Sequence, residues 1–257
     1  MRKILEALED GDISVDAAEA ELRGYASNDG GRFDAARVVR GGVPEAILGD
    51  GKTPVEVAAL AATAVETTGR VIATRVTGEQ VAAIRRRLAA DHPGTTIRWR
   101  ERSHVVVGHA PDFEPPRLDA DVGIVTAGTS DAIPAGEAAA IVGEMGARVG
   151  RIDDVGVAGI ARLLDRLDDI RAHDVIIVAA GREGALPTVV AGLVDVPVIG
   201  LPVSTGYGQG GDGEAAALGM LQSCTALTTV NVDAGFTAGA QAGLIARQLD
   251  AARGKRP

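Results

Sequence analysis

Cys224, the single cysteine of the 257-residue chain, is the strongest candidate nucleophile. It lies between a helical apolar pattern at 214–222 and a strand-like run at 227–232. A thiolate attacks electrophilic carbon readily, but the carboxyl end of a helix disfavours a thiolate, so activation must come from another group. A buried structural cysteine is the alternative, and the spacing alone does not decide between the two. With no second cysteine, an internal disulfide and a multi-thiolate zinc site are both excluded.

Two other segments carry polar side chains suited to chemistry. Glu183 lies in the glycine-flanked stretch 181–184, where a carboxylate can act as a general base; a solvated loop glutamate is the alternative. In 128–131 the order is Gly, Thr, Ser and Asp, at the predicted start of a helix. Ser130 and Asp131 there either cap the helix or share its free amides with a phosphate.

Further polar segments suggest binding. The long glycine-rich stretch 202–213 resembles a loop that covers a substrate, and it lacks the Gly-Lys-Ser/Thr ending of a Walker phosphate loop. Asp34, Arg37 and Arg40 are spaced to share one helical face, which offers two guanidinium groups to an anion; a solvated charged face is the alternative. The four histidines show no metal-ligand spacing, so we expect no metal site.

The elements that must position these residues form a regular series after residue 121. Apolar strand-like runs alternate there with helical patterns. The strands are expected at 122–126, 148–152, 175–179, 196–200 and 228–232, and the helices near Glu137 and at 160–170, 187–194, 214–222 and 238–249. Five such units predict a parallel sheet covered on both faces, a three-layer αβα domain over 117–257. Ligands bind at the carboxyl ends of such strands.

The first part of the chain, residues 1–116, reads as a smaller α/β module. Short amphipathic helices are expected at 4–8 and 15–22. Thr53-Pro54-Val55-Glu56 is a good helix start and Gly69 a good stop, followed by strand, helix and strand patterns at 70–76, 79–90 and 103–108. The proline-containing segment 110–116 is the expected linker.

Composition narrows the classes of partner. The 35 acidic residues outnumber the 26 Lys plus Arg, giving a net charge of -9, so we expect no nucleic-acid binding. No stretch has the roughly 18 uninterrupted apolar residues of a membrane span, and the amino terminus lacks signal-peptide character, so we expect a cytoplasmic protein with no membrane contact. The chain has Lys only at positions 3, 52 and 255, which indicates either a GC-rich genome or adaptation to high salt.

Several motifs together resemble the LarB family, the pyridinium-3,5-biscarboxylic acid mononucleotide synthases. The matching stretches span nearly the whole chain. They are Asp34-x-x-Arg37-x-x-Arg40-x-Gly42-x-Pro44-Glu45, Gly51-Lys52, Gly128-Thr129-Ser130-Asp131, Glu183-Gly184-Ala185-Leu186-Pro187, Gly206-Tyr207-Gly208, Met220-Leu221-x-Ser223-Cys224 and Asn231-x-Asp233-x-Gly235-Phe236. The resemblance implies a carboxyl-terminal domain like PurE, the carboxylases and mutases of aminoimidazole ribonucleotide.

The resemblance also implies a reaction. The thiolate of Cys224 would add to the pyridinium ring of nicotinic acid adenine dinucleotide, and the resulting enamine would attack CO2. Rearomatisation expels the thiolate, and hydrolysis of the phosphoanhydride gives AMP and the dicarboxylated mononucleotide, a precursor of the nickel-pincer nucleotide used in lactate racemase maturation. No tightly bound cofactor is implied; Mg2+ is a candidate aid to hydrolysis. We expect a homo-oligomer, with an octamer as one form.

By the same resemblance, Glu183 would manage the ring proton or assist hydrolysis. The residues expected to bind the substrate are Asp34, Arg37, Arg40, Lys52, Gly128, Thr129, Ser130, Asp131, Gly181, Gly184, Ala185, Gly206 and Gly208. The chain departs from the family pattern at Arg182, where an apolar Met is expected, and at Ala234, where Asn is common.

Two alternatives compete with this prediction. An aminoimidazole ribonucleotide mutase or carboxylase would need a histidine before Leu186-Pro187, where this chain has Ala185, and another within 153–157, where it has none. A non-catalytic nucleotide-binding module would explain the glycine-rich loops, but it has no need of a thiol beside them.

Overall fold

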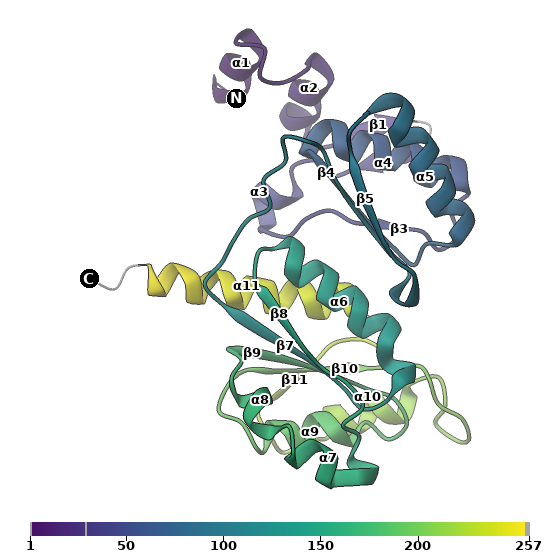
Figure 1. Cartoon of the computed structure of the whole chain (residues 1–257), viewed down its shortest axis with the longest axis vertical. Coiled ribbons are helices and arrows are strands. Elements are labelled where there is room, and N and C mark those ends of the chain that lie inside the picture. Colours follow the sequence, from purple (N-terminus) through teal and green to yellow (C-terminus); the bar gives the residue numbers. More distant parts are fainter. Residues whose placement is uncertain (1, 29, 255–257) are drawn as a thin grey trace. The chain divides into compact units, whose positions relative to one another are not determined.

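The chain divides into two compact units, Met1–Glu114 and Pro115–Pro257. The structure, a computed structural model, describes residues 2–28 and 30–254. The division falls between residues 114 and 115, inside the segment expected to be the linker, whereas the sequence analysis places it after residue 116. Each unit has its own sheet and its own core (Figure 1).

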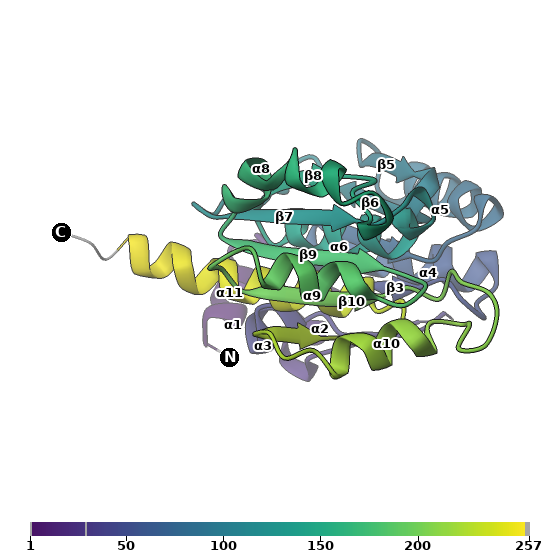
Figure 2. The ribbon, with the colours of Figure 1, turned by 90° about the horizontal axis from the view of Figure 1, so that it is seen from below.

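The carboxyl-terminal unit is built on a parallel sheet, as predicted. Its strands are β7 (Asp121–Thr126), β8 (Arg148–Ile152), β9 (Val175–Ala180), β10 (Val198–Pro202) and β11 (Leu227–Thr229). Their order across the sheet is β11-β10-β9-β7-β8, and all neighbouring pairs are parallel. Figure 2 shows β7, β9 and β10 pointing the same way.

This strand order creates a crevice at one place. β7 lies between β8 and β9, so the chain leaves β7 in one direction and returns across it to reach β9. The loops that follow β7 and β9 therefore diverge. Ligands of doubly wound sheets bind at such a reversal, beyond the carboxyl ends of the strands.

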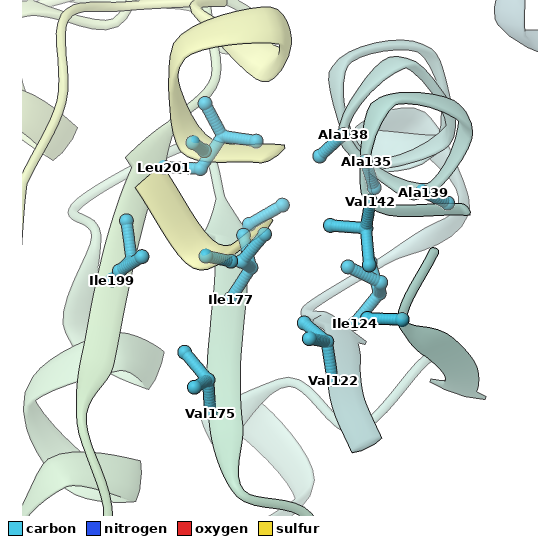
Figure 3. Close-up of a cluster of buried hydrophobic side chains, with 14 of the residues drawn as sticks. Val122, Ile124, Ala135, Ala138, Ala139, Val142, Val175, Ile177, Ile199 and Leu201 are labelled. Carbon is cyan, nitrogen blue, oxygen red and sulfur yellow. The ribbon is translucent and has the colours of Figure 1, made fainter. Parts of the chain in front are cut away.

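Helices cover both faces of this sheet and complete the three layers. One face packs against α6 (Ala132–Glu144) and α11 (Gly235–Arg253). The other face packs against helices that include α9 (Ala185–Ala191) and α10 (Glu214–Leu221). Figure 3 shows the first core, where Ile124 and Ile177 of the strands face Ala135 and Val142 of α6.

One predicted helix of this unit is wrong in detail. The continuous helix expected over 160–170 is two short helices, α7 (Ile160–Leu164) and α8 (Leu167–Arg171). The break falls at Asp165 and Arg166, where the Arg166 amide donates to Leu163, three residues back, in a tighter turn than the α-helix allows. Buried Leu163 and Ile170 still lie on the same core, so the apolar spacing was informative although the helix is interrupted.

The α6 and α11 helices approach closely because α11 has three glycines spaced four residues apart in its first half. A Cβ on Gly239 would lie 2.6 Å from the backbone oxygen of Ala138, and one on Gly243 would lie 2.5 Å from the sulfur of Met145. A Cβ on Gly235 would lie 2.2 Å from the oxygen of Pro134. Residues four apart share one helical face, so these glycines form a continuous seam against α6.

The amino-terminal unit is a mixed sheet with helices, as expected of a small α/β module. The elements are α1 (Arg2–Glu9), α2 (Val15–Arg23), β1 (Ala26–Asn28), β2 (Gly31–Phe33), α3 (Arg37–Gly41), β3 (Ile47–Leu48), α4 (Pro54–Thr68), β4 (Arg70–Thr74), α5 (Gly78–Asp91), β5 (Thr96–Arg100) and β6 (Val105–His109). The main sheet has the order β3-β4-β6-β5, in which β3 pairs parallel to β4 and the other pairs are antiparallel.

Local signals fix the helix ends in this unit. Thr53 caps α4 by accepting from the Glu56 amide, Glu56 accepts in return from the Thr53 amide, and Gly69 ends the helix in a left-handed conformation. These features confirm the predicted start and stop of α4. The sequence analysis missed β5, whose alternating pattern places only Ile97 and Trp99 toward the core.

The glycine seam predicts a stability difference between two helix substitutions. Gly239→Val forces a branched side chain against the α6 backbone and is expected to lower the free energy of unfolding by about 1–3 kcal/mol. Gly143→Ala, where a Cβ would meet no atom within 4 Å, is the matched control. It is expected to raise the free energy of unfolding by about 0.5–1 kcal/mol, because Ala favours a helix over Gly. Urea unfolding measures both, and equal destabilisation by the two variants would contradict the packing role of the seam.

Candidate active site

A pocket of about 560 Å³ opens at the crevice between the loops after β7 and β9. Four loops supply its lining, each following a different strand of the parallel sheet. The lining residues are Ala127, Gly128, Ser130, Asp131, Gly156, Val157, Ala158, Arg162, Ala180, Gly181, Arg182, Glu183, Ala185, Leu186, Thr205, Gly206 and Tyr207. The position agrees with the expectation that ligands bind where the strand order reverses.

The Asp131 carboxyl group ties three of these loops together. It is 2% exposed, and its Oδ2 accepts a hydrogen bond from the Gly128 amide at 2.7 Å. Burial raises the pKa of Asp131, and hydrogen bonds from the backbone amides of Gly128, Ala127 and Gly181 and from the Thr205 hydroxyl oppose that rise. These donors come from the loops after β7, β9 and β10. Asp131 therefore holds the pocket in shape, and its donors leave it little capacity for a ligand.

Two glycines allow the loop after β9 to lie close to its neighbours. A Cβ on Gly181 would be 2.3 Å from the Thr205 backbone oxygen. Gly184 has a φ of 65° and begins α9, and a Cβ there would be 2.5 Å from the Ala216 oxygen of α10. The loop carrying Glu183 is thus fixed between two neighbouring segments, and Glu183 itself is exposed at the pocket.

The next loop along the sheet is held by contacts at both ends. The amide of Ser204 donates to Asp233 Oδ1 at 2.9 Å, which joins the loop after β10 to the turn after β11. Farther along, the Tyr207 ring lies 4.0 Å from the guanidinium carbon of Arg182, and the Tyr207 hydroxyl accepts from Arg182 Nη2 at 2.9 Å. The predicted substrate-covering loop therefore contacts the Glu183 loop directly.

The structure brings most of the predicted residues of this unit together. Gly128, Ser130, Asp131, Gly181, Glu183, Ala185 and Gly206 line the pocket. Thr129, Gly184 and Gly208 belong to the same loops but are not part of its lining. Gly184 is buried against α10 and supports the loop rather than facing the cavity.

Cys224 is not beside these loops, contrary to the sequence analysis. The thiol is exposed and lies between the end of α10 and the start of β11. α10 runs back along the sheet for eight residues, about 12 Å. Thr225, the residue after Cys224, lines a different pocket together with Pro197 and Val198, at the amino end of β10. Cys224 follows α10, which is labelled in Figure 2, and precedes the start of β11. It therefore lies at the amino ends of the strands, the opposite edge of the sheet from the pocket of its own chain.

The four charged candidates of the amino-terminal unit have partners inside that unit. Arg40 pairs with Asp34 at 2.6 Å, and Arg37 pairs with Glu45 at 2.6 Å. Lys52 Nζ donates to the Leu48 oxygen at 2.8 Å. Arg37 and Arg40 fall on the short helix α3, where the sequence predicts a helical turn. Their contribution to substrate binding stays a prediction.

Sequence reasoning missed several pocket residues. Arg162 lies in α7 and pairs with Asp154 at 2.8 Å, and Gly156 and Val157 come from the loop after β8. The sequence of that loop carries no histidine and no other local signal of a binding residue. The shared rule that ligands meet the carboxyl ends of strands would have pointed to it.

Metal and membrane features complete the description of the chain. Within residues 2–28 and 30–254, no three or more His, Cys, Asp and Glu side chains are grouped so as to hold a metal ion. Every helix of the same residues is too short or too polar to span a bilayer.

Comparison with known proteins assigns both units. Residues 25–109 match the LarB/PurE-like N-terminal domain, and residues 121–256 match AIR carboxylase, where AIR is aminoimidazole ribonucleotide. The chain belongs to the LarB family. Its carboxyl-terminal unit is an AIR carboxylase-related domain, which makes the chain an enzyme of the carboxylase or mutase type.

A relative and a solved structure accompany this assignment. The chain is 37% identical over 254 residues to the uncharacterized protein MJ0165 of Methanocaldococcus jannaschii, covering 96% of this chain and 97% of that protein. The crystal structure of a single-substitution variant of Treponema denticola PurE2 matches with a TM-score of 0.37 and 20% identity, over 53% of this chain and 98% of that one.

The buried Asp131 predicts a pH dependence of stability. Its pKa is raised in the folded protein, so the folded state holds the proton more tightly than the unfolded chain does. Its contribution to stability is therefore full below the unfolded pKa, about 3.9, and is lost as the pH rises through the higher folded pKa. Asp131→Asn keeps an acceptor oxygen but removes the titration.

The measurement is the free energy of unfolding in urea from pH 4 to 8. The wild-type protein is expected to lose stability relative to Asp131→Asn as the pH rises, because only the wild type must bury a charge. Parallel curves for the two proteins over this range would show that Asp131 is not titrating in that window.

Proposed function

We propose that this LarB protein carboxylates the pyridinium ring of nicotinic acid adenine dinucleotide and hydrolyses its phosphoanhydride. The Cys224 thiolate adds to a ring carbon, which neutralises the ring and leaves an enamine. An enamine carbon attacks CO2, the same carbon then loses its proton, and the thiolate departs as the ring becomes aromatic again. Water cleaves the phosphoanhydride to release AMP and pyridinium-3,5-biscarboxylic acid mononucleotide. We place this reaction in the cytoplasm, as a step toward the nickel-pincer nucleotide.

The observation that carries the proposal is that a carboxylate and a loop with glycine and serine at a helix start line one pocket. Glu183 is exposed at the cavity and can accept the ring proton. Gly128 and Ser130 line the same cavity, on a loop whose exposed hydroxyl can donate to a phosphate or ribose. The volume of about 560 Å³ suits a nucleotide-sized ligand.

The position of Cys224 requires a second chain in this proposal. The thiol and the pocket lie at opposite edges of one sheet. We therefore propose that the thiol of a neighbouring copy completes each pocket. Exposed apolar side chains lie on α10 near the thiol, with Leu218 49% and Leu221 68% exposed. Burial of these side chains would favour association of copies through this helix. The protein is therefore proposed to act as a homo-oligomer.

Aminoimidazole ribonucleotide chemistry is the second candidate, and the lining of the pocket counts against it. Ala185 occupies the place before Leu186 where that reaction uses a histidine. The loop after β8 contributes Gly156, Val157 and Ala158, and no histidine among the described residues lines the cavity. No tightly bound cofactor is proposed, and Mg2+ remains a proposed aid to the hydrolysis step through charge neutralisation on the phosphates.

Product analysis tests the proposed reaction. Incubation with nicotinic acid adenine dinucleotide, bicarbonate and Mg2+ is expected to yield AMP and the dicarboxylated mononucleotide, detected by mass spectrometry. Cys224→Ala is expected to lower the carboxylation rate at least about 1000-fold, as loss of a nucleophile does in other enzymes. Gln222→Ala, at a neighbouring exposed position, is the control and should keep its activity. Unchanged dinucleotide with the wild-type protein would refute the reaction; turnover of aminoimidazole ribonucleotide would favour the second candidate.

Mixed oligomers test whether the thiol acts in a neighbouring copy's pocket. Cys224→Ala and Glu183→Gln chains, each inactive alone, are co-expressed with different tags and purified together. With random pairing of equal amounts, about a quarter of the pockets receive both intact residues, and activity should recover to about that fraction. Co-expression of the double variant with itself is the control. Absence of recovery in a confirmed mixed oligomer would place both groups in one chain.

A further inference from the structure

We infer that Arg182 binds an oxyanion of the substrate, a carboxylate or a phosphate, in the pocket after β9. The inference rests on the proposed function, because it concerns the ligand of the same pocket. Arg182 lies beside Glu183 in the pocket lining, and its side chain reaches the loop after β10.

The charge of Arg182 is the first support. No carboxylate of the described residues lies within ion-pairing distance of its guanidinium, whose contacts are with Tyr207. The other guanidinium of the pocket, that of Arg162, is already paired with Asp154 at 2.8 Å. Asp131 cannot serve Arg182, because it is buried and accepts bonds from the loop amides. Among the described residues that line the pocket, Arg182 is therefore a cation that lacks an anion.

The conformation of Arg182 is the second support. Its φ is 55°, in the left-handed region that side chains other than Gly rarely adopt. Strained backbone of this kind persists where the surroundings fix it, and it is concentrated at binding and catalytic sites. Here the tight packing of Gly181 and Gly184 on either side fixes the loop. The backbone thus directs this side chain toward the loop after β10 at the pocket.

The contact with Tyr207 prepares the guanidinium for a planar anion. The ring lies 4.0 Å from the guanidinium carbon, and the hydroxyl accepts from Nη2 at 2.9 Å. Stacking restricts the plane of the group while leaving further N–H donors for a ligand. A fork of parallel N–H groups matches the two oxygens of a carboxylate or phosphate. A lysine at this position would supply the charge without the fork or the stacking.

A purely structural role is the competing explanation. Arg182 would then only fasten the loop after β10 to the loop after β9 through Tyr207, and its loss would weaken every ligand alike. An oxyanion-binding role instead predicts a loss that depends on which oxyanion the ligand carries. The two explanations therefore differ in the pattern of affinities rather than in their size.

The experiment compares three ligands by calorimetry on the full chain. Nicotinic acid mononucleotide carries both a ring carboxylate and a phosphate, nicotinamide mononucleotide carries only the phosphate, and nicotinic acid riboside carries only the carboxylate. Arg182→Met replaces the guanidinium with an apolar side chain. Arg166→Met is the matched control, because Arg166 is paired with Asp169 at 2.6 Å and lies outside the pocket lining.

The expected result is a selective loss in Arg182→Met of about 10- to 100-fold in affinity, the range for a hydrogen bond to a charged group. If Arg182→Met loses affinity for nicotinic acid mononucleotide and nicotinic acid riboside but not for nicotinamide mononucleotide, Arg182 binds the ring carboxylate. If the variant loses affinity for both mononucleotides but not for the riboside, Arg182 binds the phosphate. Arg182→Lys should recover only part of the affinity, and Arg166→Met should match the wild type.

Other outcomes contradict the inference. Equal weakening of all three ligands in Arg182→Met, reproduced by Tyr207→Ala, would establish the structural role instead. Unchanged affinities in Arg182→Met, with normal conversion of the dinucleotide by the wild type, would refute the Arg182 inference alone. Failure of the wild-type protein to bind any of the three ligands, together with unchanged dinucleotide in the product analysis, would refute both this inference and the proposed function.

Discussion

The buried carboxyl group of Asp131 is the interaction on which the pocket depends. Its oxygens accept bonds from backbone amides and a hydroxyl in loops that leave three different strands. Those loops are distant in sequence, and the parallel sheet brings only their starting points together. Without this shared acceptor, the loop amides would have to donate to water instead, and no single group would fix the loops relative to one another. A short carboxylate side chain thus converts neighbouring strand ends into one binding site.

The order of the strands and the close packing of α6 against α11 also position the pocket, although they lie outside it. The reversal at β7 and β9 opens the crevice, and the small residues of α11 let two helices pack tightly against the sheet below it. Ala135, Ala138 and Val142 of α6 meet Ile124 and Ile177 of the strands (Figure 3). The opposite face carries α10, which buries Ala216 and Met220 but leaves Leu218 and Leu221 exposed. One face is thus covered within the chain, and the other keeps two large apolar side chains exposed.

Local sequence signals predicted the helices and strands better than the tertiary contacts between them. The runs that form β7, β9 and β10 are almost entirely apolar because helices cover both faces of the sheet. The Thr53 cap fixes the start of α4 through contacts within four residues. The strand order, by contrast, depends on pairings between distant residues. The rule that ligands bind at the carboxyl ends of strands predicted the pocket residues of three loops. The prediction that Cys224 lies beside those loops was wrong, because α10 carries the chain back to the other edge of the sheet. The contact of Arg182 with Tyr207 links residues 25 positions apart and has no local signature.

The distance between Cys224 and the pocket of its own chain affects what a subunit can do before it assembles with other copies. On the proposed mechanism, a newly synthesised subunit has the recognition surface at one end of its sheet and the nucleophile at the other. A dinucleotide captured at that stage meets no thiol and leaves unmodified. On that mechanism, adduct formation begins only after subunits have joined, so an unassembled subunit could bind the dinucleotide but could not react with it.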